Sequence, residues 1–163
     1  MINNESYGCL MIKIPIKNWD KILSKIKKED LYLNKDSIRD GLETNPHITV
    51  LYGFHQGTDI KKLKKLLKDK TVNLSIDKMS LFENEDYDVL KFNVISDDLI
   101  ELNKLMRNNF EYTSNFPNYI PHLTIAKIKK GKGKKYIQKV KKLEINNINS
   151  FIFSDNNDNE IKI

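Results

Sequence analysis

The chain has 163 residues, 39% of them hydrophobic, which is enough to bury one core and argues against global disorder. Its net charge of +6 rests on lysine, with arginine only at Arg39 and Arg107, so recognition of duplex DNA through base edges is disfavoured. No run of about 18 apolar residues predicts a membrane span, and the single cysteine, Cys9, excludes an internal disulfide.

The N-terminal residues MINNESYG lack the basic-then-apolar order of a signal peptide. Together with the lone cysteine, this predicts a reducing compartment, the cytoplasm. The positive charge chiefly indicates solubility, and it would also attract a phosphate-bearing ligand.

The first half of the chain alternates strand and helix patterns. Apolar, β-prone residues predict buried strands at 7–15 and 46–54. Apolar side chains at helical spacing predict amphipathic helices at 16–28 and 59–69, the second of which follows a Thr-Asp pair that can cap its N-terminus.

The second half repeats this outline. Its expected elements, in chain order, are strands at 71–83 and 87–95, a helix that starts near Ser96 or Asp97, a strand at 121–129, a turn at 131–135, a short helix at 134–142, and strands at 143–153 and 161–163. No Gly-rich phosphate loop and no low-complexity linker occur. We therefore expect an α+β fold of two lobes within a single domain, residues 1–163.

A short phrase occurs twice, 75 residues apart: NPHITV at 45–50 and IPHLTI at 120–125. Both copies have the order Pro-His-apolar-Thr-apolar, and they contain two of the three histidines of the chain. One His-x-Thr arises often by chance, but two five-residue matches argue for a shared role. The third histidine, His55, follows a glycine outside the phrase and is expected in a surface loop.

Residues two apart in a strand face the same side, so His47 points with Thr49, and His122 with Thr124. The apolar residues between them face the other way and can anchor each strand in the core. If the two halves pack about a pseudo-twofold axis, the four polar side chains meet in one cleft.

Such a set suits phosphodiester chemistry. A neutral imidazole can take a proton from the attacking hydroxyl or water, and a protonated imidazole can give one to the leaving oxygen. Two threonine hydroxyls can donate hydrogen bonds to the non-bridging phosphate oxygens. This scheme requires no metal or other cofactor, and the sequence shows no third and fourth ligand at the spacing of a zinc site.

The paired PHIT and PHLT resemble the signature of the 2H phosphoesterase superfamily over most of the chain. This resemblance implies two similar lobes, with antiparallel sheets flanked by helices around a central cleft with pseudo-twofold symmetry. It also implies a metal-independent phosphodiesterase, with His47, Thr49, His122 and Thr124 as its catalytic residues.

A narrower resemblance rests on the stretch GLETNPHITVLYGF and the start YGCLMIKIP. These are similar to the phage anti-CBASS nucleases, 2H proteins that destroy the cyclic oligonucleotide signals of bacterial antiphage defence. The resemblance implies hydrolysis of 3′–5′ linkages in a cyclic di- or trinucleotide, with a ribose 2′-hydroxyl as nucleophile and a cyclic phosphate as intermediate. It further implies immune evasion in the host cytoplasm, with a small nucleotide as partner and neither duplex DNA nor a membrane.

A nucleotide substrate also needs surfaces for its bases, and aromatic side chains stack on any base. Glu43, four residues before the first motif histidine, is a candidate to orient it, and the C-terminal strand around Phe151 and Phe153 is a candidate to line the pocket. Ordinary packing or a solvated surface is the alternative role for each substrate-binding candidate, and these candidates are Tyr7, Phe116, Tyr119 and Lys127.

Two other functions stay open at this point. An RNA 2′,3′-cyclic phosphodiesterase or RNA-end processing enzyme would use the same four residues in an open groove rather than a closed pocket. A non-catalytic nucleotide-binding or RNA-binding module would have no reason to keep histidine and threonine at both motifs, so catalysis is favoured.

Overall fold

The computed structural model describes residues 6–33 and 41–163. The elements are β1 (Gly8–Lys13), α1 (Trp19–Ser24), η1 (Lys28–Asp30), β2 (His47–Phe54), α2 (Ile60–Leu67), β3 (Val72–Glu83), β4 (Tyr87–Ile95), α3 (Asp97–Asn109), β5 (His122–Lys129), η2 (Lys134–Tyr136), β6 (Leu143–Ile148), β7 (Phe151–Ser154) and β8 (Glu160–Lys162). Here η marks a single 3₁₀ turn.

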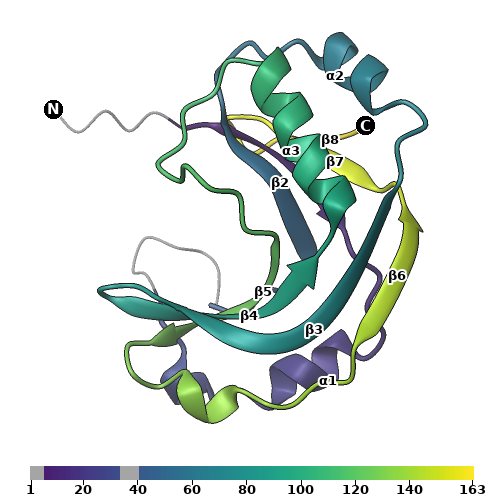
Figure 1. The fold of residues 1–163 in the computed structure, drawn as a ribbon. Coiled ribbons are helices and arrows are strands. Elements are labelled where there is room, and N and C mark those ends of the chain that lie inside the picture. Colours follow the sequence, from purple (N-terminus) through teal and green to yellow (C-terminus); the bar gives the residue numbers. More distant parts are fainter. Residues whose placement is uncertain (1–5, 34–40) are drawn as a thin grey trace, which may run out of the picture.

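The strands form two antiparallel sheets of four strands each. The first sheet has the order β2-β1-β7-β8 and the second sheet has the order β5-β4-β3-β6. In Figure 1 the first sheet lies in the upper lobe beside α2 and α3, and the curled β3–β4 hairpin forms the lower lobe with α1 beneath it. The predicted α+β fold with two antiparallel lobes is confirmed.

The two sheets share one local plan. Each motif strand, β2 or β5, lies at the edge of its sheet and pairs with one neighbouring strand, β1 or β4. Both pairs skip one residue directly after the motif threonine: Val50 lies opposite no partner in the β1–β2 pair, and Ile125 lies opposite none in the β4–β5 pair. A β-bulge at equivalent positions bends both motif strands alike.

The chain that leads into each motif crosses to the edge of the other motif strand. Before the first motif, the backbone N–H of Glu43 donates to the Ile125 carbonyl of β5 at 2.9 Å. Before the second motif, the N–H of Thr113 donates to the Gly53 carbonyl of β2, also at 2.9 Å. These reciprocal bonds cover part of both open edges and hold the motif strands together, and β2 is in contact with β5.

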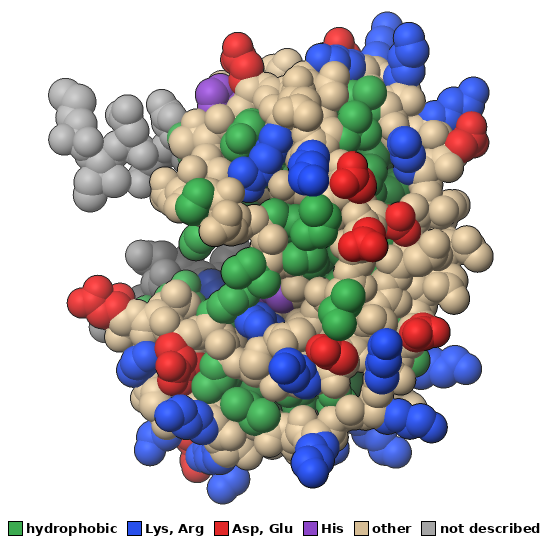
Figure 2. Space-filling view, viewed as in Figure 1, with side chains coloured by type: hydrophobic (Ala, Val, Ile, Leu, Met, Phe, Trp, Pro, Cys, Tyr) green, Lys and Arg blue, Asp and Glu red, His purple; other side chains and the backbone are tan. Residues whose placement is uncertain are grey.

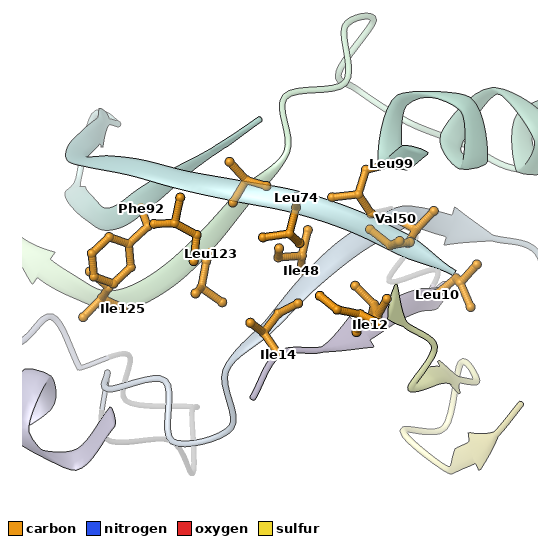
Figure 3. Close-up of a cluster of buried hydrophobic side chains, with 14 of the residues drawn as sticks. Leu10, Ile12, Ile14, Ile48, Val50, Leu74, Phe92, Leu99, Leu123 and Ile125 are labelled. Carbon is orange, nitrogen blue, oxygen red and sulfur yellow. The ribbon is translucent and has the colours of Figure 1, made fainter. Parts of the chain in front are cut away.

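The apolar residues of the motifs lie in the core, as the alternation predicts. Ile48, Val50, Leu123 and Ile125 are each fully buried. Figure 3 shows them among side chains from both sheets and from α3, including Leu10, Ile12, Leu74 and Leu99. Both motif strands are therefore fixed by burial on one face, which leaves the other face for polar side chains.

Both predicted helix starts are confirmed by their caps. The Asp59 carboxylate accepts a hydrogen bond from the backbone N–H of Lys62 at 3.1 Å, before α2. The Ser96 hydroxyl accepts one from Leu99 at 3.1 Å, before α3. Each cap satisfies a backbone N–H that the helix cannot pair internally.

The prediction of one strand at 143–153 is wrong. β6 ends at Ile148 and β7 begins at Phe151, and these two strands join different sheets. β6 pairs with β3, whereas β7 crosses to pair with β1. Apolar periodicity alone could not show that the run serves two sheets, because both of its halves are β-prone.

The helices predicted at 16–28 and 134–142 are shorter than expected. α1 ends at Ser24, and only a 3₁₀ turn forms at Lys134–Tyr136. One tertiary contact connects these two segments. The backbone N–H of Lys27 donates to the Tyr136 hydroxyl at 3.0 Å, and the backbone of Lys27 is extended rather than helical. The Tyr136 hydroxyl in turn donates to the buried Asp30 carboxylate.

Within residues 6–33 and 41–163, no helix has the length and apolar character needed to cross a membrane. The N-terminal residues 1–5, on which part of the expectation about a signal peptide rests, lie outside the described residues.

Candidate active site

His47 and His122 begin their strands with the same ring geometry. Nδ1 of His47 lies 2.8 Å from the carbonyl oxygen of Asn45, and Nδ1 of His122 lies 2.9 Å from that of Ile120. A carbonyl oxygen only accepts, so each Nδ1 carries a hydrogen and donates it. Nε2 is thereby the nitrogen of each ring that can take or give a proton.

Thr49 and Thr124 lie two residues further along, on the same side of each strand as the histidine. The strand register places Thr49 opposite Met11 and Thr124 opposite Lys91. The Cys9 thiol is 3.9 Å from the Thr49 hydroxyl, so these two side chains share one face of the first sheet. Burial raises the pKa of the Cys9 thiol to about 11.

The two motifs converge. β2 and β5 are in contact and each begins with its motif histidine, and the charge of His47 is among the smaller causes that lower the pKa of His122. Figure 2 shows the surface hollowed between the lobes, on the left of the view, with histidine atoms visible at the inner end of the hollow. The structure thus brings together the four residues that the repeated phrase predicts.

The surroundings of the two histidines differ in charge. Glu43 places a carboxylate oxygen 3.8 Å from Nδ1 of His47, and its backbone carbonyl accepts a hydrogen bond of 2.6 Å from the Trp19 indole. Glu43, a candidate from the sequence to orient the first motif histidine, therefore lies beside that ring. A carboxylate at this distance can pair with a protonated imidazole.

His122 lies instead against an aromatic ring and a cation. The Phe82 and His122 rings form a T-shaped pair, with 4.8 Å between ring centroids and 88° between planes. Burial is the largest cause that lowers the pKa of His122, the hydrogen bond to Ile120 opposes it, and the charges of Lys91 and His47 lower it further. The neutral form of His122 is favoured over the form that carries a proton on both nitrogens.

Lys91 was not predicted from the sequence, yet it lies directly beside the second motif. Its ammonium is buried against Ser80, Asn93 and the Phe82 ring. The pattern VLKFNV in β4 contained a signal for it, because a lysine and an asparagine replace apolar residues at alternate positions of a strand. That alternation indicates a polar face, and the adjacent strand is the one that carries His122.

The predicted substrate-binding residues lie in different places. Tyr7 packs edge-on against Tyr52, at 6.1 Å and 86°, at the far end of β2 from His47. Phe116 is 74% exposed on the loop before the second motif. Lys127 is exposed, with its ammonium 5.4 Å from the centre of the Tyr87 ring.

Tyr119 has a bracing contact with the first motif. Its hydroxyl donates to the Thr49 carbonyl at 2.8 Å, across the two lobes. Burial raises the pKa of this hydroxyl well above its usual range, so it remains a donor. A residue three positions before His122 thus holds the strand of Thr49.

The structure also places two phenylalanines of the C-terminal strand and the third histidine. Phe151 and Phe153 are buried in the core, at 2% and 3% exposure, so the expectation that they line the pocket is wrong. They pair with Ile12 and Leu10, whose side chains face away from the site. His55 lies after β2 on the surface, as predicted, with Nε2 at 2.8 Å from the Thr113 hydroxyl.

In the described part of the chain, no three His, Cys, Asp or Glu side chains form a group that could hold a metal ion. The comparison with curated proteins found no match. A family model described as the 2′-5′ RNA ligase superfamily matches residues 20–145, well over half of the chain, and this span includes both motifs. The match confirms the predicted 2H phosphoesterase relationship and fits a phosphodiesterase. The chain therefore belongs to the 2′-5′ RNA ligase superfamily.

Proposed function

We propose that the protein is a metal-independent phosphodiesterase in which His47 and His122 exchange protons with a nucleotide substrate. The observation that carries this proposal is the matched pair of rings, each held by Nδ1 on the carbonyl two residues earlier and each presenting Nε2. Two imidazoles arranged in this way suit one base and one acid acting on opposite sides of a phosphate. Thr49 and Thr124 donate hydrogen bonds to the non-bridging oxygens, where charge accumulates.

The surroundings of the two rings support one assignment of the base and acid roles, which is part of this proposal. His122, against Phe82 and Lys91, starts neutral and acts as the general base. His47 lies beside the Glu43 carboxylate, which can pair with an imidazolium, and it is given the role of general acid. The proposed scheme uses the two rings in opposite protonation states within one site.

In the proposed step, Nε2 of His122 takes the proton of a ribose 2′-hydroxyl, and the oxygen forms a new bond to the adjacent phosphorus. The bond from phosphorus to the 5′ oxygen breaks, and that oxygen receives the proton from Nε2 of His47. The products are a 2′,3′-cyclic phosphate and a free 5′-hydroxyl. A water molecule can open the cyclic phosphate by the same two proton transfers, with the roles of the histidines exchanged.

We propose a cyclic di- or trinucleotide second messenger as the substrate, which would make the protein an inhibitor of CBASS antiphage signalling. The exposed aromatic side chains of Tyr52 and Phe116 support a nucleotide ligand, since one lies on the strand of Thr49 and the other on the loop before His122. Tyr7, in contact with Tyr52, extends this aromatic surface.

A second candidate is an enzyme that acts on RNA ends with a 2′,3′-cyclic phosphate. The description of the matching family, which names RNA ligation, favours it. The same four residues would serve, with water or a 5′-hydroxyl as the attacking group.

One experiment separates the candidates. The purified protein is incubated with cyclic dinucleotides, cyclic trinucleotides and RNA bearing a 2′,3′-cyclic end, and the products are identified by mass spectrometry. Opening of the cyclic oligonucleotides supports the proposed substrate, whereas conversion of the RNA ends alone supports the second candidate. If no phosphodiester in the panel reacts, the proposed function is wrong.

Activity should survive prolonged treatment with EDTA, because proton transfer by two histidines and hydrogen bonds from two threonines do not involve a metal. The measurement is the rate of substrate opening before and after chelation and dialysis. Loss of activity that zinc or manganese restores would contradict the scheme.

The value of kcat/KM should follow a bell-shaped pH profile. The base must be neutral, and a lowered pKa keeps His122 neutral to lower pH, so the acidic limb should lie below the ordinary histidine value of about 6.5. Both limbs are properties of the coupled pair. The profile is measured in buffers of constant ionic strength, and a rate that rises steadily to alkaline pH would count against two-histidine catalysis.

A further inference from the structure

Lys91 is a buried cation whose hydrogen-bond partners are all neutral. It is 5% exposed, and its ammonium donates to the Ser80 hydroxyl at 2.7 Å and to the Asn93 side-chain oxygen at 2.8 Å. The same nitrogen lies 4.2 Å from the centre of the Phe82 ring. None of the ion pairs formed within residues 6–33 and 41–163 includes Lys91.

A buried charge without a counter-charge is costly, because water solvates an ammonium far better than neutral protein groups do. Burial accordingly lowers the pKa of Lys91. The two hydrogen bonds and the ring offset only part of this cost. An anionic ligand would supply the missing negative charge.

The strand register places this ammonium next to the phosphate position. Lys91 lies opposite Thr124, and Asn93 lies opposite His122, so all four side chains are on one face of the second sheet. The charge of Lys91 also reaches His122, whose pKa it lowers. A phosphate that accepts from the Thr124 hydroxyl would therefore lie close to the Lys91 ammonium.

The first lobe has an equivalent of the Lys91 position, and its residue shows whether the fold needs a lysine there. In each sheet, one residue lies opposite the motif threonine and next to the bulge. This residue is Met11 in the first sheet and Lys91 in the second. Met11 is nearly buried, at 9% exposure. Because the fold accommodates an unbranched apolar side chain there, packing alone does not explain the lysine.

We propose that Lys91 is the cation of the site that binds a non-bridging oxygen of the substrate phosphate, beside Thr124. The inference rests on the proposed function in that this phosphate is the one attacked. It gives the second lobe a charged contact to the phosphate that the first lobe, with Met11 at the equivalent position, lacks. As negative charge builds up on the phosphate oxygens, the buried ammonium stabilises it more strongly than a surface lysine would.

The test compares Lys91→Met with Lys64→Met, which removes the same charge from an exposed position on α2. We expect Lys91→Met to lower kcat/KM by about 10²-fold, the size of effect seen when one donor to a developing charge is removed, and Lys64→Met to leave it unchanged. The melting temperature of Lys91→Met should stay the same or rise, because an unpaired buried charge is lost. A purely structural lysine would instead lower it.

A binding experiment with inorganic phosphate does not depend on turnover. The wild-type protein is titrated with phosphate, and the His122 ring is followed by NMR. Phosphate should shift the ring resonances and raise the pKa of His122, because it counters the charges of Lys91 and His47. The other groups against this ring, Phe82 and the Ile120 carbonyl, are neutral. The response should be lost in Lys91→Met and kept in Lys64→Met.

The outcomes separate this inference from the proposed function. If the wild type opens substrate but Lys91→Met is as active as Lys64→Met, the role of Lys91 is wrong and the function stands. If no substrate reacts but phosphate binds in a manner that depends on Lys91, the function fails and the anion site stands. If the His122 resonances of the wild type do not respond to phosphate, the inference is overturned, whether or not Lys91→Met folds.

Discussion

His47→Ala and His122→Ala should each lower kcat by about 10²–10⁴-fold, the range expected when a general acid or base is lost. In the proposed mechanism each ring presents its own Nε2 to one phosphate, and neither ring can take over the role of the other in the same step. The measurement is turnover of a 3′,3′-cyclic dinucleotide, or of the substrate that the panel identifies. His55→Ala is the matched control, since it removes the remaining histidine from the surface.

The double variant gives the sharper result. Residues that act as a unit are not additive, so the loss in the double variant should be far smaller than the product of the two single losses. Thr49→Val and Thr124→Val should lose less than either histidine variant, because proton transfer is intact and one hydrogen-bond donor is missing. The apolar anchors Ile48 and Leu123 are unchanged, so circular dichroism should show native folding throughout. If one histidine is dispensable while the other is essential, the two-histidine site is wrong.

Gly53→Ala should destabilise the fold by at least about 2 kcal/mol and impair the site indirectly. Gly53 has φ +113°, and an added Cβ would lie 2.0 Å from the Thr113 carbonyl oxygen. That oxygen belongs to the crossing segment whose N–H bonds to Gly53 before the chain reaches the second motif. The substitution therefore both strains β2 and pushes away the segment that positions Tyr119 and His122.

Gly57→Ala is the control that separates backbone strain from the clash. Gly57 also has a positive φ of 84°, but an added Cβ there would meet nothing within 4 Å. It should cost only the conformational term of about 1–2 kcal/mol. The measurement is the free energy of unfolding in urea, together with kcat/KM at a temperature where both variants are folded. Equal losses at the two positions would show that the crossing contact at Gly53 does not matter.

The repeated phrase determined the most about this protein. Strand alternation was enough to place His47 with Thr49 and His122 with Thr124, and to bury Ile48 and Leu123 behind them, because side chains of a β-strand alternate regardless of what the strand packs against. The caps at Asp59 and Ser96 were equally local, since each forms within three residues. The family followed from the same motif pair.

Tertiary structure decided everything that depends on partners distant in sequence. No local pattern could divide the run at 143–153 between two sheets, because that choice depends on which strand, β3 or β1, has an open edge nearby. Helix 16–28 was likewise shortened by a hydrogen bond from the Lys27 backbone to Tyr136, more than 100 residues later. Burial of Phe151 and Phe153 followed from their pairing with β1 and could not be inferred from their own segment.

The difference between the two histidines is also a property of the tertiary structure. The phrase presents them as equivalent. Glu43 was a candidate neighbour of His47 from its place in the sequence, whereas only packing sets Lys91 and Phe82 beside His122. Charge and burial act through space, so the pKa of His122 is lowered by groups that its own motif does not contain. The sequence alone determined which side chains share a face, and the pairing of the sheets decided which charges they meet.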